Sequence, residues 1–155
     1  QGMASFRGVD RRFDFKIKTS RLVFLSDYAH HPAEIAQSVK SVRELYKDKK
    51  ITAIFQPHLY TRTRDFYKDF ADSLSLLDEV ILTEIYPARE QPIPGVSSRL
   101  IYDNLRPGIE KCICPKEDIL NLLSKKSVEV LIVLGAGDLD NYVPSITQLL
   151  EQQSK

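Results

Sequence analysis

The amino-acid sequence predicts an α/β protein built on an open, mostly parallel sheet of about six strands, with helices on both faces. Short apolar runs alternate with amphipathic segments along almost the whole chain. Most of these runs are continuously apolar, which is typical of parallel strands covered on both faces. The length of 155 residues suits one compact domain, so residues 1–155 are expected to fold as a single domain.

Strands are expected at five apolar runs: residues 22–28, 51–56, 80–85, 111–114 and 128–134. A further segment, residues 12–18, alternates Phe13, Phe15 and Ile17 with polar residues. Such alternation indicates a half-buried strand, and we expect it at an edge of the sheet, running antiparallel.

Helices are expected between these strands. Residues 33–47 carry apolar side chains on one helical face: Ile35, Val39, Val42 and Tyr46. Residues 62–77 carry a similar stripe: Phe66, Phe70, Leu74 and Leu77. Thr61 is placed to cap this second helix. Shorter helices are expected at residues 98–105, 117–124 and 142–151.

Composition and charge exclude several classes of protein. The 22 basic and 21 acidic side chains give a formal net charge of +1, so no basic surplus indicates nucleic-acid binding. The longest apolar stretch, residues 128–134, is too short to cross a bilayer, and no secretory signal is visible. Residues 1–3 resemble a protease-site remnant ahead of an initiator methionine.

The two cysteines, Cys112 and Cys114, are expected to be buried and reduced. On a strand they face the same side, at a separation greater than a disulfide spans. Free thiols and the missing signal together indicate a reducing, cytoplasmic location.

Polar side chains gather where the expected strands end, at residues 26–31, 57–64, 86–90 and 135–138. In open α/β sheets, ligands bind in the crevice beyond the carboxyl ends of the strands. All three histidines of the chain, His30, His31 and His58, fall in the first two of these segments. The sequence therefore predicts a ligand site there.

A metal site formed by this chain alone is not expected. The adjacent His30 and His31 depart from the usual ligand spacings, and no Cys or His pair at three- or four-residue spacing supports them. The chain also lacks a G-x-x-x-x-G-K-[ST] phosphate loop. Residues 135–137, Gly-Ala-Gly, are interpreted as a tight strand-to-helix turn, because Asp140 occupies the third glycine position of a dinucleotide fingerprint.

Arg62 and Arg64 lie at the start of a helix, where the helix dipole disfavours cations. A carboxylate or phosphate ligand would compensate, and we expect Arg62 to contact one. Arg64 is instead expected to pair with Asp65 or Asp69 on the surface.

Two motifs, D-Y-A-H-H-P-A-E at residues 27–34 and F-Q-P-H-L-Y-T-R-T at residues 55–63, resemble the C-terminal domain of the Mur ligase family. Within it they are similar to the members that add L-alanine to UDP-N-acetylmuramate. Residues 6–13, 86–95 and 135–138 resemble the same family in the same order, so the similarity covers nearly the whole chain.

The resemblance implies a Rossmann-like fold and one part of a three-domain, ATP-dependent ligase of peptidoglycan synthesis. The other domains, absent here, would bind the UDP-sugar and ATP. ATP would phosphorylate the lactyl carboxylate of UDP-N-acetylmuramate, and the amine of L-alanine would attack the acyl phosphate. Mg²⁺ would be held mainly by the absent central domain.

Carried over by matching positions, the resemblance implies that Asp27 binds the nucleotide, at its ribose. The alanine end would be lined by four residues: Tyr28, His30, His58 and Arg62. Further candidates are His31, Tyr60, Arg89 and Glu90. Two positions depart from the pattern, since many relatives carry an acidic residue at Ser26 and an arginine at Leu59.

Two alternatives stay open. The sister ligase that attaches a recycled murein tripeptide to the same sugar nucleotide shares the fold and the histidine-rich loop. A stand-alone module that binds a small ligand would also lack a phosphate loop.

Overall fold

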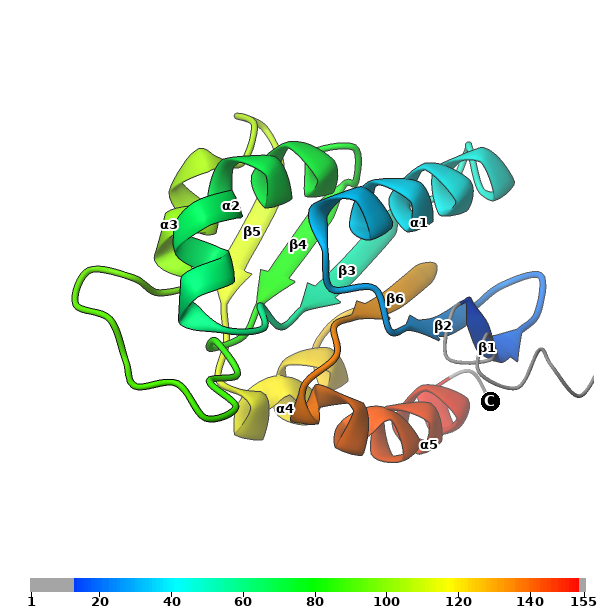
Figure 1. The fold of residues 1–155 in the computed structure, drawn as a ribbon. Helices are drawn as coiled ribbons and strands as arrows, with labels where there is room; N and C mark the ends of the chain where they lie inside the picture. The colour runs from blue at the N-terminus through cyan, green and yellow to red at the C-terminus, as the bar shows by residue number, and fades with distance from the viewer. Residues whose placement is uncertain (1–12, 154–155) are drawn as a thin grey trace, which may run out of the picture.

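A six-stranded sheet forms the centre of the computed structural model, which describes residues 13–153 (Figure 1). Its strands are β1 (Asp14–Lys18), β2 (Val23–Asp27), β3 (Ile51–Phe55), β4 (Glu79–Leu82), β5 (Glu110–Ile113) and β6 (Val130–Leu134). Their order across the sheet is β1-β2-β6-β3-β4-β5. Only β1 pairs antiparallel among these six described strands. The expected fold class and the antiparallel edge strand are both confirmed.

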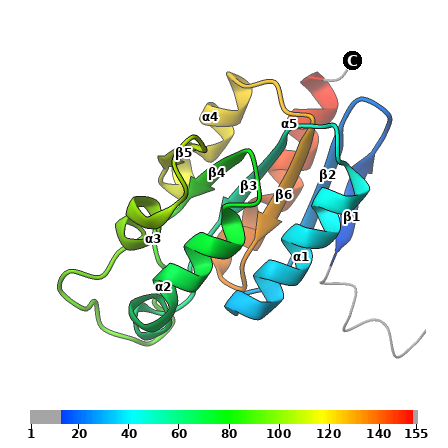
Figure 2. The same ribbon diagram turned by 90° about the horizontal axis from the view of Figure 1, so that it is seen from above.

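The helices cover both faces of the sheet (Figures 1 and 2). One face carries α1 (Pro32–Leu45), α2 (Tyr60–Leu74) and α3 (Arg99–Asn104). The other carries α4 (Ile119–Ser124) and α5 (Val143–Gln153), each preceded by a 3₁₀ segment, Lys116–Asp118 and Asp138–Tyr142. Helix ends differ from the sequence expectations by a few residues, because periodicity places apolar faces better than it places termini.

Alternating residues of each strand divide the core into two layers. On β6, Ile132 packs beneath α1 and α2 with Val39 and Phe70. Its neighbour Leu131 faces the other layer and packs with Ile146 of α5. Since successive side chains of a strand point to opposite faces, a continuously apolar strand is what a sheet covered twice requires.

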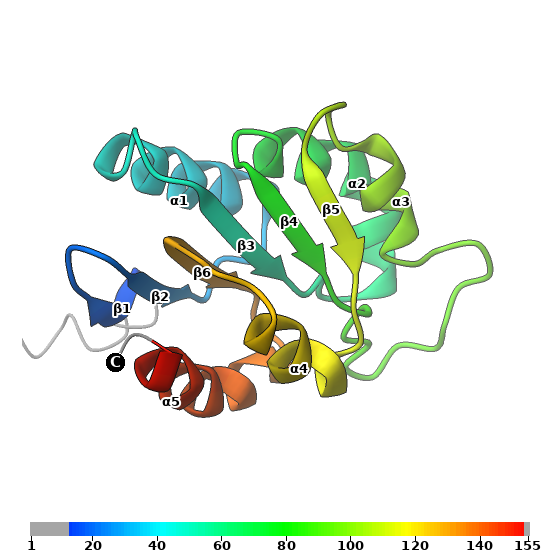
Figure 3. The same cartoon turned by 180° about the vertical axis from the view of Figure 1, so that it is seen from behind.

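The position of β6 makes the carboxyl ends of β2, β6 and β3 the place where a ligand crevice is expected. This strand is the last in the chain, yet it lies between β2 and β3. The chain leaves β2 and β3 toward α1 and α2 on one face, and it leaves β6 toward α5 on the other (Figure 3). Connections that diverge in this way open a ligand crevice at the strand ends.

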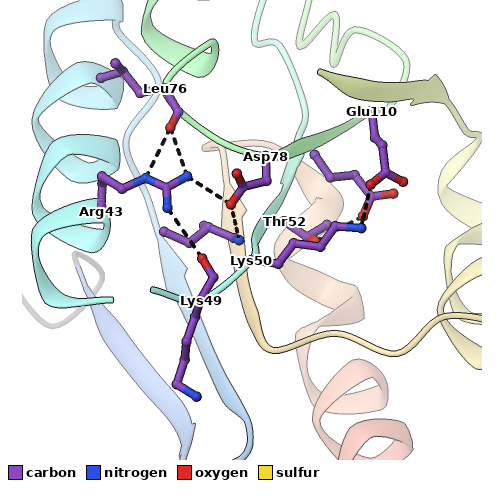
Figure 4. Close-up of polar contacts among 9 residues, drawn as sticks. Arg43, Lys49, Lys50, Thr52, Leu76, Asp78 and Glu110 are labelled. Carbon is purple, nitrogen blue, oxygen red and sulfur yellow. Dashed lines mark hydrogen bonds and ion pairs between the residues drawn. The ribbon is translucent and has the colours of Figure 1, made fainter. Parts of the chain in front are cut away.

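At the amino ends of the parallel strands, opposite the carboxyl edge, Arg43 joins several segments by hydrogen bonds (Figure 4). Its guanidinium donates to the carbonyl oxygens of Leu76 and Lys49, and to the carboxylate of Asp78 at 2.9 Å. The same Asp78 oxygen accepts the backbone N–H of Ile51 at 2.8 Å. One side chain thus joins the end of α1 to the segments that start β3 and β4.

Both cysteines are free thiols, as expected. Cys112 is half-buried in β5, and Cys114 is buried just after it. Burial raises the pKa of Cys114 to about 11, so the thiol is protonated at neutral pH.

No helix among residues 13–153 is long and apolar enough to span a membrane. Residues 1–3 and most of the motif at residues 6–13 lie outside the described part of the chain.

Candidate functional site

The loops at the carboxyl edge of the sheet bring the three histidines together. His30 follows β2 and His58 follows β3, and their ring centroids lie 5.7 Å apart. The ring of His31 lies 4.7 Å from that of His30. Because β6 separates β2 from β3, these loops meet across its end. The clustering expected from the positions of these histidines after the strand ends is present.

Two oxygen atoms orient the imidazole of His30. Its Nδ1 lies 3.1 Å from the backbone carbonyl oxygen of Tyr28 and 3.6 Å from Oε1 of Glu34. Oε1 of Glu34 also accepts the backbone N–H groups of His30 and His31, both at 3.1 Å. His31 is the exposed N-cap residue of α1, so its backbone fixes the start of that helix. The ring of Tyr28 packs edge-on against His30 at 5.9 Å.

Arg62 reaches back one helical turn to His58. Its Nη1 lies 3.3 Å from Nδ1 of His58. Burial lowers the pKa of His58, and the neighbouring Arg62 and His30 lower it further, against the opposing charge of Glu90. Burial followed by the charge of Arg62 also lowers the pKa of His31. Both shifts disfavour a second positive charge on His58 or His31 beside the guanidinium of Arg62.

The start of α2 is capped by Glu90, from the loop after β4. Its carboxylate accepts the backbone N–H of Tyr60 at 2.6 Å and that of Thr61 at 3.1 Å, together with the hydroxyl of Thr61. The Thr61 hydroxyl bond is the main cause that lowers the pKa of Glu90. The expectation that Thr61 caps this helix is wrong. The helix begins at Tyr60, and its N-cap is Leu59, at a φ of 77°.

The remaining sequence candidates are spread around this cluster. Arg64 pairs with Asp65 at 2.9 Å on the surface, as expected. Arg89 is exposed on the loop after β4. Tyr60 lines a neighbouring pocket of 170 Å³ between α2 and the segment leading into α3. The walls of that pocket are Tyr60, Glu84, Ile85, Val96, Ser97, Ser98, Arg99 and Ile113.

Asp27 is buried at the end of β2, with 3% of its surface exposed. One carboxylate oxygen accepts the backbone N–H of Ala29 at 2.9 Å, and the other accepts the hydroxyl of Ser38 at 2.5 Å. These two hydrogen bonds hold the carboxylate between the end of β2 and α1.

Sequence reasoning missed a network that joins the loops after β3, β5 and β6. Gln56 donates from Nε2 to Asp138 at 2.8 Å and accepts the backbone N–H of Leu139 at 2.9 Å. Lys116 donates to the other oxygen of Asp138 at 2.6 Å. Burial opposes ionisation of Asp138, but the bonds from Lys116 and Gln56 outweigh it and lower the pKa of that carboxyl. The available sequence signal was a glutamine placed directly between an apolar strand and the Pro57-His58 pair, and the structure shows that this glutamine is buried.

The glycines after β6 make close approach to this network possible. Gly135 adopts a φ of 138°, and a Cβ there would lie 2.9 Å from the carbonyl oxygen of Gln56. A Cβ on Gly137 would lie 2.5 Å from Oε1 of Gln56 and 2.7 Å from Cγ of Tyr86. The interpretation of residues 135–137 as a tight turn is confirmed. Tyr86, with its ring 5.5 Å from His58, is a further residue that the sequence did not single out.

Comparison with known proteins places this arrangement in a family. Residues 11–139 match the family model described as Mur ligase, glutamate ligase domain. A UDP-N-acetylmuramate–L-alanine ligase from Phocaeicola vulgatus is 77% identical over 153 residues, covering 99% of this chain and 33% of that protein. The chain thus spans about a third of the length of the curated relatives it matches.

Two solved structures of Mur-type ligases have the same fold as this chain. A UDP-N-acetylmuramate–alanine ligase from Thermotoga maritima superposes with a TM-score of 0.74 at 30% identity, covering 97% of this chain and 32% of that one. A murein peptide ligase from Psychrobacter arcticus superposes with a TM-score of 0.71 at 17% identity, covering 90% of this chain and 30% of that one, and so shows the fold alone. With the fold, the family model and both loop motifs in agreement, the chain belongs to the Mur ligase family, as its glutamate ligase domain.

Proposed function

We propose that this chain is the C-terminal domain of a longer, cytoplasmic, ATP-dependent ligase that joins L-alanine to UDP-N-acetylmuramate in peptidoglycan synthesis. The observation that carries the proposal is the grouping of His30, His58 and Arg62 at the carboxyl edge of the sheet. The named relatives support the choice of substrates, since they carry that activity in their names.

At the alanine end, Arg62 holds the substrate carboxylate. A guanidinium has five N–H donors in a planar fork, so donation to His58 leaves donors for a carboxylate. Tyr28, His30 and His58 line the rest of this pocket. Glu90 acts on it indirectly, by fixing the first turn of the helix that carries Arg62.

At the nucleotide end, the carboxylate of Asp27 accepts a hydrogen bond from a hydroxyl of the ATP ribose. Its bonds to Ala29 and Ser38 hold the carboxylate in place for this. Among residues 13–153, no group of three or more His, Cys, Asp and Glu side chains is arranged to hold a metal ion. The donor set of this part of the chain does not fit Mg²⁺, which we assign to another domain of the enzyme together with most phosphate contacts.

The proposed reaction passes through an acyl phosphate formed on the lactyl carboxylate of UDP-N-acetylmuramate. The amine of L-alanine attacks the acyl carbon, and collapse of the tetrahedral intermediate releases phosphate and leaves the amide. An acyl phosphate is prone to hydrolysis, so closing this domain over the site also serves to exclude water.

The test is phosphate release by the full-length protein with UDP-N-acetylmuramate, ATP and Mg²⁺. Strong stimulation by L-alanine, and not by the recycled murein tripeptide, is the expected result. Stimulation by the tripeptide alone would assign the chain to the sister ligase. If neither amine stimulates phosphate release, a stand-alone ligand-binding module becomes the better reading. The 155 residues alone are expected to fold without ligase turnover.

A further inference from the structure

The contacts of His30 and His58 give the two imidazoles opposite tautomers. A neutral imidazole carries a hydrogen on one ring nitrogen and a lone pair on the other. The guanidinium of Arg62 has no acceptor, so the 3.3 Å contact with His58 requires a lone pair on Nδ1 of His58. Nε2 of a neutral His58 therefore carries the hydrogen and is a donor.

At His30 the assignment is reversed. Its Nδ1 faces two acceptors, the carbonyl oxygen of Tyr28 at 3.1 Å and the carboxylate of Glu34 at 3.6 Å. A carbonyl oxygen cannot donate, so Nδ1 of His30 carries the hydrogen. Nε2 of a neutral His30 is left with the lone pair and accepts protons.

We propose that Nε2 of His30 removes the proton from the ammonium group of the incoming amino acid, while Nε2–H of His58 donates a hydrogen bond to an oxygen at the same centre. This division of roles rests on the proposed function, since it assigns the acid–base work of that reaction. Opposite tautomers on neighbouring histidines supply one acceptor and one donor while both imidazoles are neutral.

Two protons leave the nitrogen of the amino acid during the proposed reaction. An N–H bond of the ammonium breaks, its electron pair stays on nitrogen, and the proton bonds to Nε2 of His30. The nitrogen lone pair then forms the C–N bond to the acyl carbon of the acyl phosphate. A second proton leaves the nitrogen for an oxygen of the departing phosphate as the C–O bond to that phosphate breaks.

Several charged and titratable groups surround His30. Oε1 of Glu34, from α1, lies 3.6 Å from Nδ1 of His30. The rings of His31 and His58 lie 4.7 Å and 5.7 Å from its ring, and Arg62 contacts His58. The side chain of His30 is 25% exposed, so the proton can pass from the ring to water after each turnover.

The tautomers are measured directly by NMR on the full-length protein labelled with ¹⁵N-histidine. Two-bond ¹H–¹⁵N correlations at about pH 8, where histidine is neutral, distinguish N–H nitrogens from bare ones. Spectra of the variants His30→Gln and His58→Gln assign the signals. We expect N–H at Nδ1 of His30 and at Nε2 of His58. A hydrogen on Nε2 of His30 would overturn the proposal whatever the substrate proves to be.

The base role is measured by the pH dependence of kcat/KM for L-alanine. His30→Gln is expected to lower it by roughly 10²–10⁴-fold near neutral pH, as loss of a general base does. The deficit should shrink as pH rises, because the amine then loses its proton unaided. His58→Leu is the matched control, since leucine has no N–H donor and the resulting fall in kcat/KM should persist at high pH.

The fall in kcat/KM of His30→Gln could be the same at every pH, or it could come from KM alone. Either result would show that His30 only lines the alanine pocket and is not the base. Failure of the proposed function is recognised separately. In that case the unaltered protein shows no alanine-dependent phosphate release, which also removes the base role, while the NMR result still shows which nitrogen carries the hydrogen.

Discussion

Arg62 and Arg64 lie two residues apart on α2 and have different surroundings. Arg62 points back to His58 at the carboxyl edge, whereas Arg64 pairs with Asp65 in solvent. Sequence spacing placed both at the start of a helix. The separation into a residue of the candidate site and a surface residue comes from the direction of each side chain around the helix axis.

This difference predicts the effect of Arg62→Ala in the full-length protein. Loss of a charged hydrogen-bond partner for the substrate carboxylate should raise the KM for L-alanine roughly 10- to 100-fold. Steady-state kinetics measure it, and Arg64→Ala is the matched control, expected within about twofold of the unaltered enzyme. An unchanged KM in Arg62→Ala would remove this residue from the alanine pocket.

The lowered pKa of His58 predicts a pH dependence of stability. Burial, with Arg62 and His30, holds the pKa in the folded state below the ordinary value of 6.5. The unfolded chain therefore binds a proton first as pH falls below 6.5, and the free energy of unfolding decreases. Well above pH 6.5, His58 is neutral in both the folded and the unfolded state, so it causes no loss of stability there.

Urea unfolding of the chain at about pH 7.5 and about pH 5.5 measures this effect, near the ordinary pKa of histidine. His58→Gln should reduce the loss of stability between the two values. Equal losses in the variant and the unaltered chain would show that His58 keeps its ordinary pKa after folding.

At the scale of elements, α2 depends on a carboxylate that lies far from it in the chain. Glu90 caps this helix across 30 residues of sequence, as the Tyr60 bond shows. No local pattern reveals such a cap, because capping rules look for Ser, Thr, Asp or Asn at the helix start. Sequence reasoning therefore chose Thr61, which instead donates its hydroxyl to Glu90.

Replacing Glu90 by glutamine is expected to lower the melting temperature and to raise the KM for L-alanine together. An amide still accepts a hydrogen bond, but it loses the charge that favours the helix N-terminus. Thermal unfolding and steady-state kinetics measure the two effects. Glu84→Gln, at an exposed carboxylate just after β4, is the control. A fall in melting temperature without a change in KM would separate Glu90 from the placement of Arg62.

The turn after β6 allows a steric test of the cross-loop network. Gly137 has an ordinary φ of −95°, so the cost of Gly137→Ala comes from crowding Gln56 and Tyr86. We expect a loss of about 1–3 kcal/mol in the free energy of unfolding, as for other overpacked sites.

Gly108→Ala is the comparison for Gly137→Ala. Nothing lies within 4 Å of a Cβ on Gly108, whose φ is +93°, so that variant reports backbone strain alone. Chemical denaturation of both variants gives the comparison. A cost no larger for Gly137→Ala than for Gly108→Ala would mean that Gln56 and Tyr86 move aside freely.

Across the whole molecule, the carboxyl and amino ends of the parallel strands differ in what they contribute. The carboxyl edge carries the candidate site, and the amino edge carries the Arg43 bonds to Leu76, Lys49 and Asp78. Arg43→Met keeps the apolar stem and removes those bonds, so it should cost about 1–2 kcal/mol of stability. The KM for L-alanine should stay unchanged. A raised KM in Arg43→Met would show that the edges are coupled.

The sequence predicted the layers of this fold but not the order of its strands. Continuous apolar runs such as residues 128–134 identify strands covered on both faces, and the helical stripes identify what covers them. Periodicity cannot tell which strands are neighbours, so the insertion of β6 between β2 and β3 was not foreseen. The histidine cluster was foreseen, because carboxyl ends of parallel strands share one edge. The Gln56–Asp138 bond was not, since it joins residues 82 positions apart.

The central place of β6 also bears on how the chain is made. During synthesis, β2 and β3 emerge from the ribosome about a hundred and about eighty residues before the strand that pairs with both of them. Until residues 130–134 are synthesised, β2 and β3 lack the central strand that pairs with both of them, and one edge of each stays unpaired. Such edges are prone to pair with other chains. The nascent domain is therefore most exposed to aggregation just before its last strand is translated, and that is when chaperone contacts with β2 and β3 should be most frequent.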